Sequence, residues 1–142
     1  MGKQISVFLE NKAGRLSNVT RVLGDAGINI RALSIADTSD FGILRIIVND
    51  PSRAYRILKD AGFTVSETEV IAVQVPDSPG GLASVLEQMA DANLNIEYLY
   101  AFLGTSQGEA LVIFKVEDIE RAYQAFKERE IKFIEEQDLY QL

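Results

Sequence analysis

Two short stretches place a polar side chain and a glycine just ahead of a helical pattern. Asn11-x-x-Gly14-x-Leu16 recurs 66 positions later as Asp77-x-x-Gly80-x-Leu82. A helix N-terminus offers unpaired N–H groups and the positive end of a dipole, which suit a carboxylate or a phosphate. Glycine lets the backbone approach a ligand closely, although Gly, Pro and Asn are also ordinary turn residues. A plain turn and a binding loop both stay open, and the recurrence favours binding.

Two asparagines recur at the same spacing. Asn29 and Asn95 each open the second strand of a repeat between apolar neighbours. Because asparagine is disfavoured in strands, each carboxamide either caps its own loop or faces the amino or carboxylate group of a ligand. The second strand is an edge strand in the predicted topology, where two modules can meet side by side, and this favours the ligand-facing interpretation.

Side chains for catalysis or metal binding are scarce. The chain has no cysteine and no histidine, so disulfides, thiolate nucleophiles and histidine-based chemistry are excluded. The carboxylates of Asp91, Glu97 and Glu109 show no paired spacing for acid–base work. We therefore predict no catalytic residue, no metal and no cofactor, while activation by a lysine stays open.

The composition describes an ordinary globular chain with an uneven charge. Its 142 residues are 47% apolar, enough for a buried core, and the net charge of −7 argues against nucleic acid as a partner. Residues 1–70 carry a net charge of +1 and residues 71–142 a net charge of −8, so the first half is better suited to an anionic ligand group. No apolar run approaches the ~20 residues that span a bilayer, so no membrane contact is predicted and the cytoplasm is the expected location.

Each half of the chain predicts the order strand, helix, strand, strand, helix, strand. In the first half we expect strands at 4–9, 28–37 and 42–49, a helix over 16–26 that Gly27 closes, and a helix from Asp50-Pro51 to Gly62. In the second half we expect helices around 82–89 and 122–126, and strands at 94–103, 109–116 and 131–136. The hairpin loops fall at 38–40 and 104–108, and the stretch 63–76 serves both halves.

This order predicts an α+β protein of two ferredoxin-like βαββαβ modules with antiparallel sheets, at residues 1–70 and 71–142. Right-handed crossovers put both helices of a module on one face of its sheet. The third strands are nevertheless apolar on both faces, as in Leu44, Ile46 and Ile47. We expect the second face to be buried as well, most simply by another copy, in a homodimer or a higher homo-oligomer.

The same stretches resemble a known family. Val7 to Leu16 and Gly27-Ile28-Asn29-Ile30 look like parts of an ACT domain, and so do Val73 to Leu82 and Leu94-Asn95-Ile96. The resemblance covers the whole chain as two ACT modules. The first half is also similar to the N-terminal domain of acetohydroxyacid synthase regulatory subunits, whose Leu-Glu-Asn-x-x-Gly-x-Leu segment is like residues 9–16.

The resemblance implies modules that pair side by side into a continuous sheet and bind an amino acid where they meet. In this family the strand–helix loop of one module faces the second strand of its neighbour. The implied ligand-binding residues are Asn11, Ala13, Gly14 and Leu16 with Asn29 and Ile30, and Asp77, Pro79, Gly80, Gly81 and Leu82 with Asn95 and Ile96. Asp77 stands where the family often has Asn, which weakens carboxylate binding at that loop and favours the ammonium of the ligand.

The sequence therefore predicts an amino-acid-binding regulatory protein without catalysis. Aliphatic pocket edges favour a branched or aromatic amino acid. One alternative is a regulatory subunit that docks on an amino-acid biosynthetic enzyme such as acetohydroxyacid synthase. Two others are a small decarboxylase-like or isomerase-like enzyme of ferredoxin-like fold and a purely structural duplicate with no ligand.

Overall fold

The computed structural model describes residues 2–37, 40–103 and 108–140. Contacts divide the chain into two compact units. One, here called the N-terminal unit, holds residues 3–68 together with Tyr140, and the other, the C-terminal unit, holds residues 69–139 together with Gly2. The predicted module limits of 1–70 and 71–142 stay a prediction.

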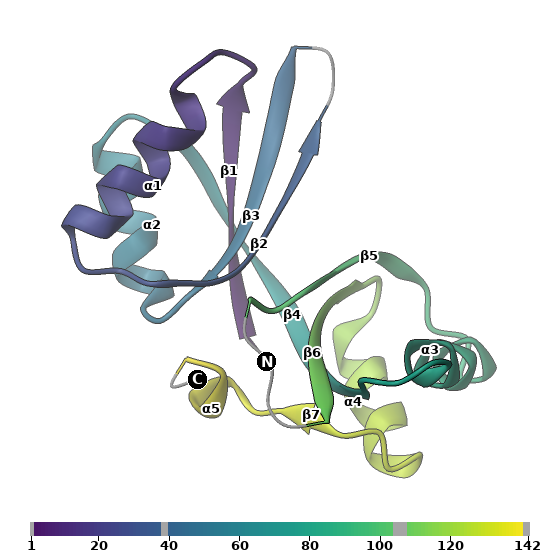
Figure 1. The fold of residues 1–142 in the computed structure, drawn as a ribbon. Helices are drawn as coiled ribbons and strands as arrows, with labels where there is room; N and C mark the ends of the chain where they lie inside the picture. Colours follow the sequence, from purple (N-terminus) through teal and green to yellow (C-terminus); the bar gives the residue numbers. More distant parts are fainter. Residues whose placement is uncertain (1, 38–39, 104–107, 141–142) are drawn as a thin grey trace. The chain divides into compact units, whose positions relative to one another are not determined.

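The N-terminal unit follows the predicted order of elements. It contains β1 (Gly2–Glu10), α1 (Arg15–Asp25), β2 (Ile30–Asp37), β3 (Phe41–Val48), α2 (Pro51–Asp60) and the first residues of β4 (Thr64–Pro76). Its strands lie in the order β2-β3-β1-β4, and β1 and β2 are both antiparallel to β3. Helices α1 and α2 lie together on one face of this sheet (Figure 1).

Sequence-local signals explain where these helices begin and which faces they bury. The carboxylate of Asp50 accepts a hydrogen bond of 3.2 Å from the backbone N–H of Arg53, and Pro51 occupies the first helical position of α2. In α1 the apolar face consists of side chains four residues apart, and Val19 and Leu23 are fully buried. They pack on the strand residues that point to the same face of the sheet, among them Ile5, Val7, Leu44 and Ile46.

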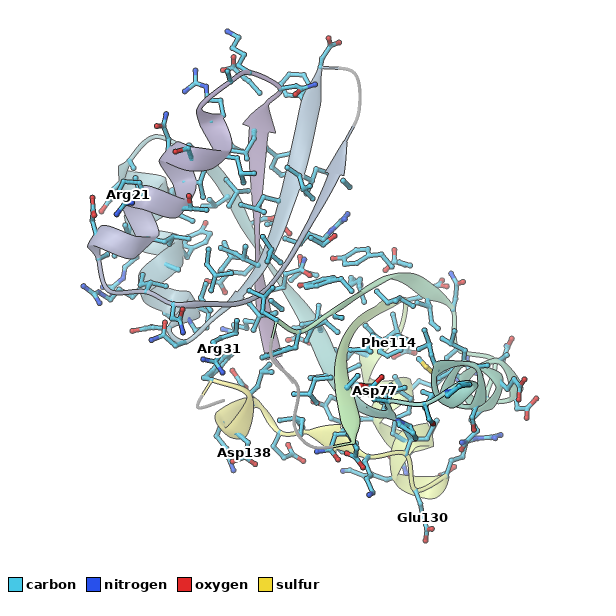
Figure 2. All side chains as sticks on the ribbon, viewed as in Figure 1. Arg21, Arg31, Asp77, Phe114, Glu130 and Asp138 are labelled. Atoms are coloured by element: carbon cyan, nitrogen blue, oxygen red, sulfur yellow. The ribbon has the colours of Figure 1, made fainter. Side chains whose placement is uncertain are left out.

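The C-terminal unit repeats this plan. It consists of the rest of β4, α3 (Gly81–Asp91), β5 (Ile96–Ala101), β6 (Glu109–Val116), α4 (Ile119–Glu128) and β7 (Phe133–Ile134). The strand order is β7-β4-β6-β5, which matches the order in the first unit when each strand is replaced by its repeat partner. Phe114 on β6, labelled in Figure 2, is fully buried in the core between this sheet and its two helices.

Both units therefore confirm the predicted α+β class and the two antiparallel βαββαβ modules. Strand alternation points the side chains of Ile47 and Ile113 away from the helices of their units. The expected burial of the second face by another copy stays a prediction.

The end of the chain differs from the prediction. A strand was expected over 131–136, but β7 has two residues and is followed by the short helix α5 (Glu136–Leu139). The carbonyl of Glu135 accepts hydrogen bonds from the backbone N–H groups of Asp138 and Leu139, so the chain turns into a helix there. Leu139 is fully buried and lies against Gly2. In the hairpins, Thr38, Ser39 and residues 104–107 lie outside the described residues.

Candidate functional site

The two strand–helix loops share one backbone design. We call residues 11–14 the first loop and residues 77–80 the second loop. The N–H of Asn11 donates to the carbonyl of Asp40 at 3.1 Å, and in the second unit the N–H of Asp77 donates to the carbonyl of Gly108 at 3.0 Å. Each loop ends on a glycine in the left-handed region, with φ of 89° at Gly14 and 82° at Gly80. The recurrence seen in the sequence is therefore a recurrence of conformation.

The helices that follow these loops start without a side-chain cap. Their N-cap residues are Gly14 and Gly80, which provide no side-chain cap. Helices α2 and α4 are different, because Asp50 and Asp118 each accept a hydrogen bond from a backbone N–H of their first turn. The first N–H of each helix, at Arg15 and Gly81, donates to the carbonyl of Lys12 or Ser78, so only the N–H groups that follow it in the first turn are candidates for a ligand or water.

A hollow of about 200 Å³ lies beside the first loop. Its lining combines aliphatic side chains with the polar groups of the loop: Leu9, Leu16, Ile35 and Gly42 with Glu10, Asn11, Lys12 and Arg15. Strand register brings these parts together, because Gly42 on β3 lies opposite Leu9 on β1 and opposite Asp37 on β2. We call it the first-loop hollow. At this volume it suits a small metabolite rather than a nucleotide.

Charged groups stand at the rim of this hollow. One carboxylate oxygen of Glu10 lies 3.0 Å from Nζ of Lys12, and the other lies 3.6 Å from a guanidinium nitrogen of Arg15. The hydrogen bond from Lys12 and the positive charges of Lys12 and Arg15 hold the pKa of Glu10 below its ordinary value. Glu10 and Arg15 also line a neighbouring hollow of about 260 Å³ with the rings of Phe8, Phe41 and Phe63.

Exposed aliphatic side chains recur at corresponding positions of the two units. Leu16 and Leu82, at the starts of α1 and α3, are 41% and 37% exposed. Leu33 and Leu99, on the edge strands β2 and β5, are 37% and 39% exposed, although strand register directs them to the helix-covered face. Each unit thus exposes one leucine at the start of its first helix and one on its edge strand.

Asn29 and Asn95 lie at the other end of their own sheets. In the first unit, Glu10 is opposite Phe41 whereas Ile30 is opposite Val48, so Asn29 is a strand length away from the first loop. The strands begin at Ile30 and Ile96, and both asparagines precede them and are exposed. Within one unit the structure therefore does not bring loop and asparagine together. A site that uses both needs two modules.

Each asparagine is held by the turn before the second helix of its unit. The N–H of Asn29 donates to the side-chain oxygen of Asn49 at 3.0 Å. The side-chain amide of Asn95 donates to the carboxylate of Glu117 at 3.2 Å. Asn95 and Glu117 line a hollow of about 360 Å³ together with Arg121, whose guanidinium donates to the carbonyl of Ala92.

The whole chain, residues 1–142, matches the family described as an ACT domain pair. This chain belongs to the ACT domain family. No curated protein sequence matches it significantly.

Solved structures show the same fold. Protein BT0572 from Bacteroides thetaiotaomicron is 42% identical, with a TM-score of 0.93 over 99% of this chain and 96% of that one. The ligand-free regulatory subunit of aspartate kinase from Thermus thermophilus is 19% identical, with a TM-score of 0.67 over 89% of this chain and 91% of that one. The regulatory subunit of aspartate kinase from Thermus flavus is 20% identical, with a TM-score of 0.61 over 89% and 90% of the two chains.

The second loop of this ACT domain pair is built more tightly than the first. Asp77, Pro79 and Gly80 are exposed, whereas Gly81 is buried with its Cα directly against the backbone of Pro76. A Cβ atom at position 81 would overlap the carbonyl oxygen of Pro76. The two loops therefore share hydrogen bonds but differ in the space and the charge around them.

Sequence reasoning missed several residues around the first-loop hollow. Lys12 and Arg15 lie inside the recognised motif, and their charges next to Glu10 were the available signal. Ile35 and Gly42 come from other strands, and only the strand register places them beside the loop.

The described part of the chain also shows neither a metal-binding cluster nor a membrane-spanning helix. In residues 2–37, 40–103 and 108–140, no group of three or more acidic side chains is placed to hold a metal ion. Across the same described ranges, no helix combines the length and the apolar character needed to cross a membrane.

Proposed function

We propose that this ACT domain pair binds a small amino acid without catalysis, and that its binding regulates an assembly of the protein or a partner enzyme. The observation that carries the proposal is the repeated start of α1 and α3. Both helices follow a left-handed glycine and lack a side-chain cap among the described residues, and both stand next to exposed leucines. Uncapped N–H groups suit a carboxylate, and the leucines suit an aliphatic side chain.

A second module completes the site in this proposal. The first-loop hollow is smaller than the range of about 300–1,000 Å³ that is usual for ligand pockets, and its exposed wall includes Ile35 on the edge strand β2. An edge strand with exposed aliphatic side chains is suited to pair with another module, from this chain or from another copy. Asn29 or Asn95 of that module then faces the loop. Side-by-side pairing along the edge strands stays a prediction.

In this proposal, regulation follows from the thermodynamic linkage between ligand binding and the pairing of two modules. A ligand that binds between two modules stabilises the paired arrangement by its difference in affinity for the paired and unpaired states, and by no more than that. Two structures with this fold are regulatory subunits of aspartate kinase, which supports a regulatory role for the fold. No catalytic step is part of the proposal.

A thermal-shift screen of the full chain against the twenty standard amino acids tests this function. A ligand that binds only the folded state at a hundredfold excess over its Kd stabilises it by about 2.7 kcal/mol, which raises Tm by several degrees. We expect at least one aliphatic amino acid to do so. Absence of any shift at millimolar amino acid would contradict the proposal.

Variants locate the site. Asn11→Ala and Asn95→Ala are each expected to weaken a hit, because one removes a loop side chain and the other removes the carboxamide of the facing strand. Asn18→Ala is the matched control, since Asn18 is exposed on α1 and does not line the first-loop hollow. Unchanged affinity in both test variants would refute these site residues.

A further inference from the structure

The first loop already holds a carboxylate. Glu10, the last residue of β1, places one oxygen 3.0 Å from Lys12 and the other 3.6 Å from Arg15. Both cations line the first-loop hollow, and so does Glu10. Among the charged side chains that line this hollow, the two cations outnumber the one anion, and Asp40 lines the adjoining hollow with Glu10 and Lys12. The pair Lys12 and Arg15 is therefore arranged to accept a carboxylate, and in the free protein it accepts an internal one.

The second loop has no counterpart of this arrangement. At the spacing of 66 residues, Glu10 corresponds to Pro76, Lys12 to Ser78 and Arg15 to Gly81. Any side chain at position 81 is excluded by the carbonyl of Pro76. Asp77 adds a negative charge where the first loop has Asn11. Two loops with the same backbone hydrogen bonds thus present opposite charges to a ligand.

We propose that Lys12 and Arg15 bind the carboxylate of an aliphatic amino acid at the first loop, and that Glu10 is an internal competitor which the ligand carboxylate displaces. This inference rests on the proposed function and specifies the ligand-binding chemistry of that site. Leu9, Leu16 and Ile35 supply the aliphatic wall. The second loop has neither of these two cations.

The exchange needs little energy. The side chains of Lys12, Arg15 and Glu10 are 68%, 42% and 49% exposed, and exposed ion pairs are individually weak. Displacement breaks the two ion pairs of Glu10 and forms two of the same kind with the ligand. Glu10 then returns to solvent. Its carboxylate lowers the affinity by competition and by repelling the incoming anion.

Isothermal titration of the full chain with L-leucine tests this, with leucinamide as the probe that lacks a carboxylate. We expect Glu10→Gln to bind leucine about threefold to tenfold more tightly than the unmodified protein, because the competitor is gone. We expect the double variant Lys12→Gln/Arg15→Gln to bind leucine at least tenfold more weakly. The affinity for leucinamide should not rise in Glu10→Gln and should not fall tenfold in the double variant.

Glu97→Gln is the matched control. Glu97 also pairs with a lysine, at 2.9 Å from Lys115, and its side chain is 46% exposed, so the substitution has the same chemistry away from the first loop. Leucine affinity should not change.

The outcomes separate this inference from the proposed function. If the unmodified protein binds leucine and Glu10→Gln binds it equally or more weakly, the competitor role is overturned and amino-acid binding stands. If only Glu10→Gln binds leucine, the competitor role is supported and the proposed function fails for leucine in the native chain. If neither binds leucine, both fail for this ligand class.

Discussion

Gly81 packs directly against the backbone carbonyl of Pro76, at the position where the first repeat has Arg15 facing Glu10. In the second repeat the backbone of Pro76 occupies the space at the start of the helix. In the first repeat the ion pair of Arg15 and Glu10 lies there. The difference lies in two residues per repeat, while the hydrogen bonds of the two loops are the same. The two modules therefore share a loop conformation but differ in the charge at the start of the helix.

Replacing Gly81 by alanine is expected to destabilise the protein by about 1–3 kcal/mol, because the new methyl group meets a backbone carbonyl that cannot rotate away. The control is Gly24→Ala in α1, where no described atom lies within 4 Å of the added carbon and helix propensity gives a gain of up to about 1 kcal/mol. Urea unfolding of both variants measures this. Equal stabilities would contradict the close packing at Gly81.

The caps of α2 and α4 predict a second pair of losses. Asp50→Ala and Asp118→Ala each remove a side chain that accepts a hydrogen bond of 3.2 Å from the first turn of its helix. Each is expected to lower the free energy of unfolding by about 1 kcal/mol.

Asp60→Ala tests whether position rather than charge causes these losses. Asp60 is the last residue of α2 and is exposed, so its negative charge faces the negative end of the helix dipole. Its removal should leave the free energy of unfolding unchanged or raise it slightly. A loss equal to that of Asp50→Ala would show that capping is not the cause.

The sequence alone predicted the elements that depend on local patterns. The repeat, the alternation in β1 and the Asp50-Pro51 start of α2 each reflect a preference set by neighbouring residues, and the structure confirms them. The end of the chain was predicted wrongly, because Ile131 and Phe133 alternate like a strand while Glu135 starts a helix. The local sequence pattern does not predict the contact between Leu139 and Gly2, which are far apart in the chain.

The site was predicted less completely than the fold. Its loops were found because glycine and a polar residue recur at fixed spacing. Its walls were not, because Ile35 and Gly42 approach Leu9 only through strand register. The position of Asn29, a strand length from the loop of its own unit, follows from the strand–helix–strand order, because the helix runs back along the sheet before β2 begins.

A strained position predicts a stabilising substitution. Glu130 follows α4 with φ of 56°, and Figure 2 shows its side chain pointing away from the protein. A side chain in the left-handed region costs roughly 1–2 kcal/mol, and glycine avoids this cost. Glu130→Gly is therefore expected to raise the free energy of unfolding by about 1 kcal/mol.

Glu128→Gly is the matched control for Glu130→Gly. Glu128 is exposed and is the last residue of α4, so the same substitution two positions earlier exchanges a good helix former for a poor one. Urea unfolding should show a loss for Glu128→Gly and a gain for Glu130→Gly. A loss in both variants would mean that the backbone at position 130 is not strained.

The buried hydroxyl of Tyr123 predicts an effect of pH. Within the described part of the chain this hydroxyl has no hydrogen-bond partner, and the ring packs edge-on against Phe133 at 5.0 Å between centroids. Burial raises the pKa of Tyr123 to about 12, and the nearby carboxylates of Glu135, Glu136 and Glu69 add to this.

The folded chain thus keeps its phenol proton at a pH where the unfolded chain, with an ordinary pKa of 10.0, has lost it. Stability must therefore fall as the pH rises from about 10 to about 12. Tyr123→Phe removes this contribution and also removes a buried polar atom without a partner. It should raise the free energy of unfolding at neutral pH by up to about 1 kcal/mol.

Tyr55→Phe is the control, because Tyr55 occupies the corresponding place on α2. Ultraviolet titration of the phenolates should lose a component near pH 12 in Tyr123→Phe and keep it in Tyr55→Phe. Urea unfolding at rising pH should show a shallower loss of stability in Tyr123→Phe alone. Loss of a component near pH 10 in Tyr123→Phe, in place of the one near pH 12, would mean that its hydroxyl reaches solvent, because a hydrated phenol ionises near its ordinary pKa.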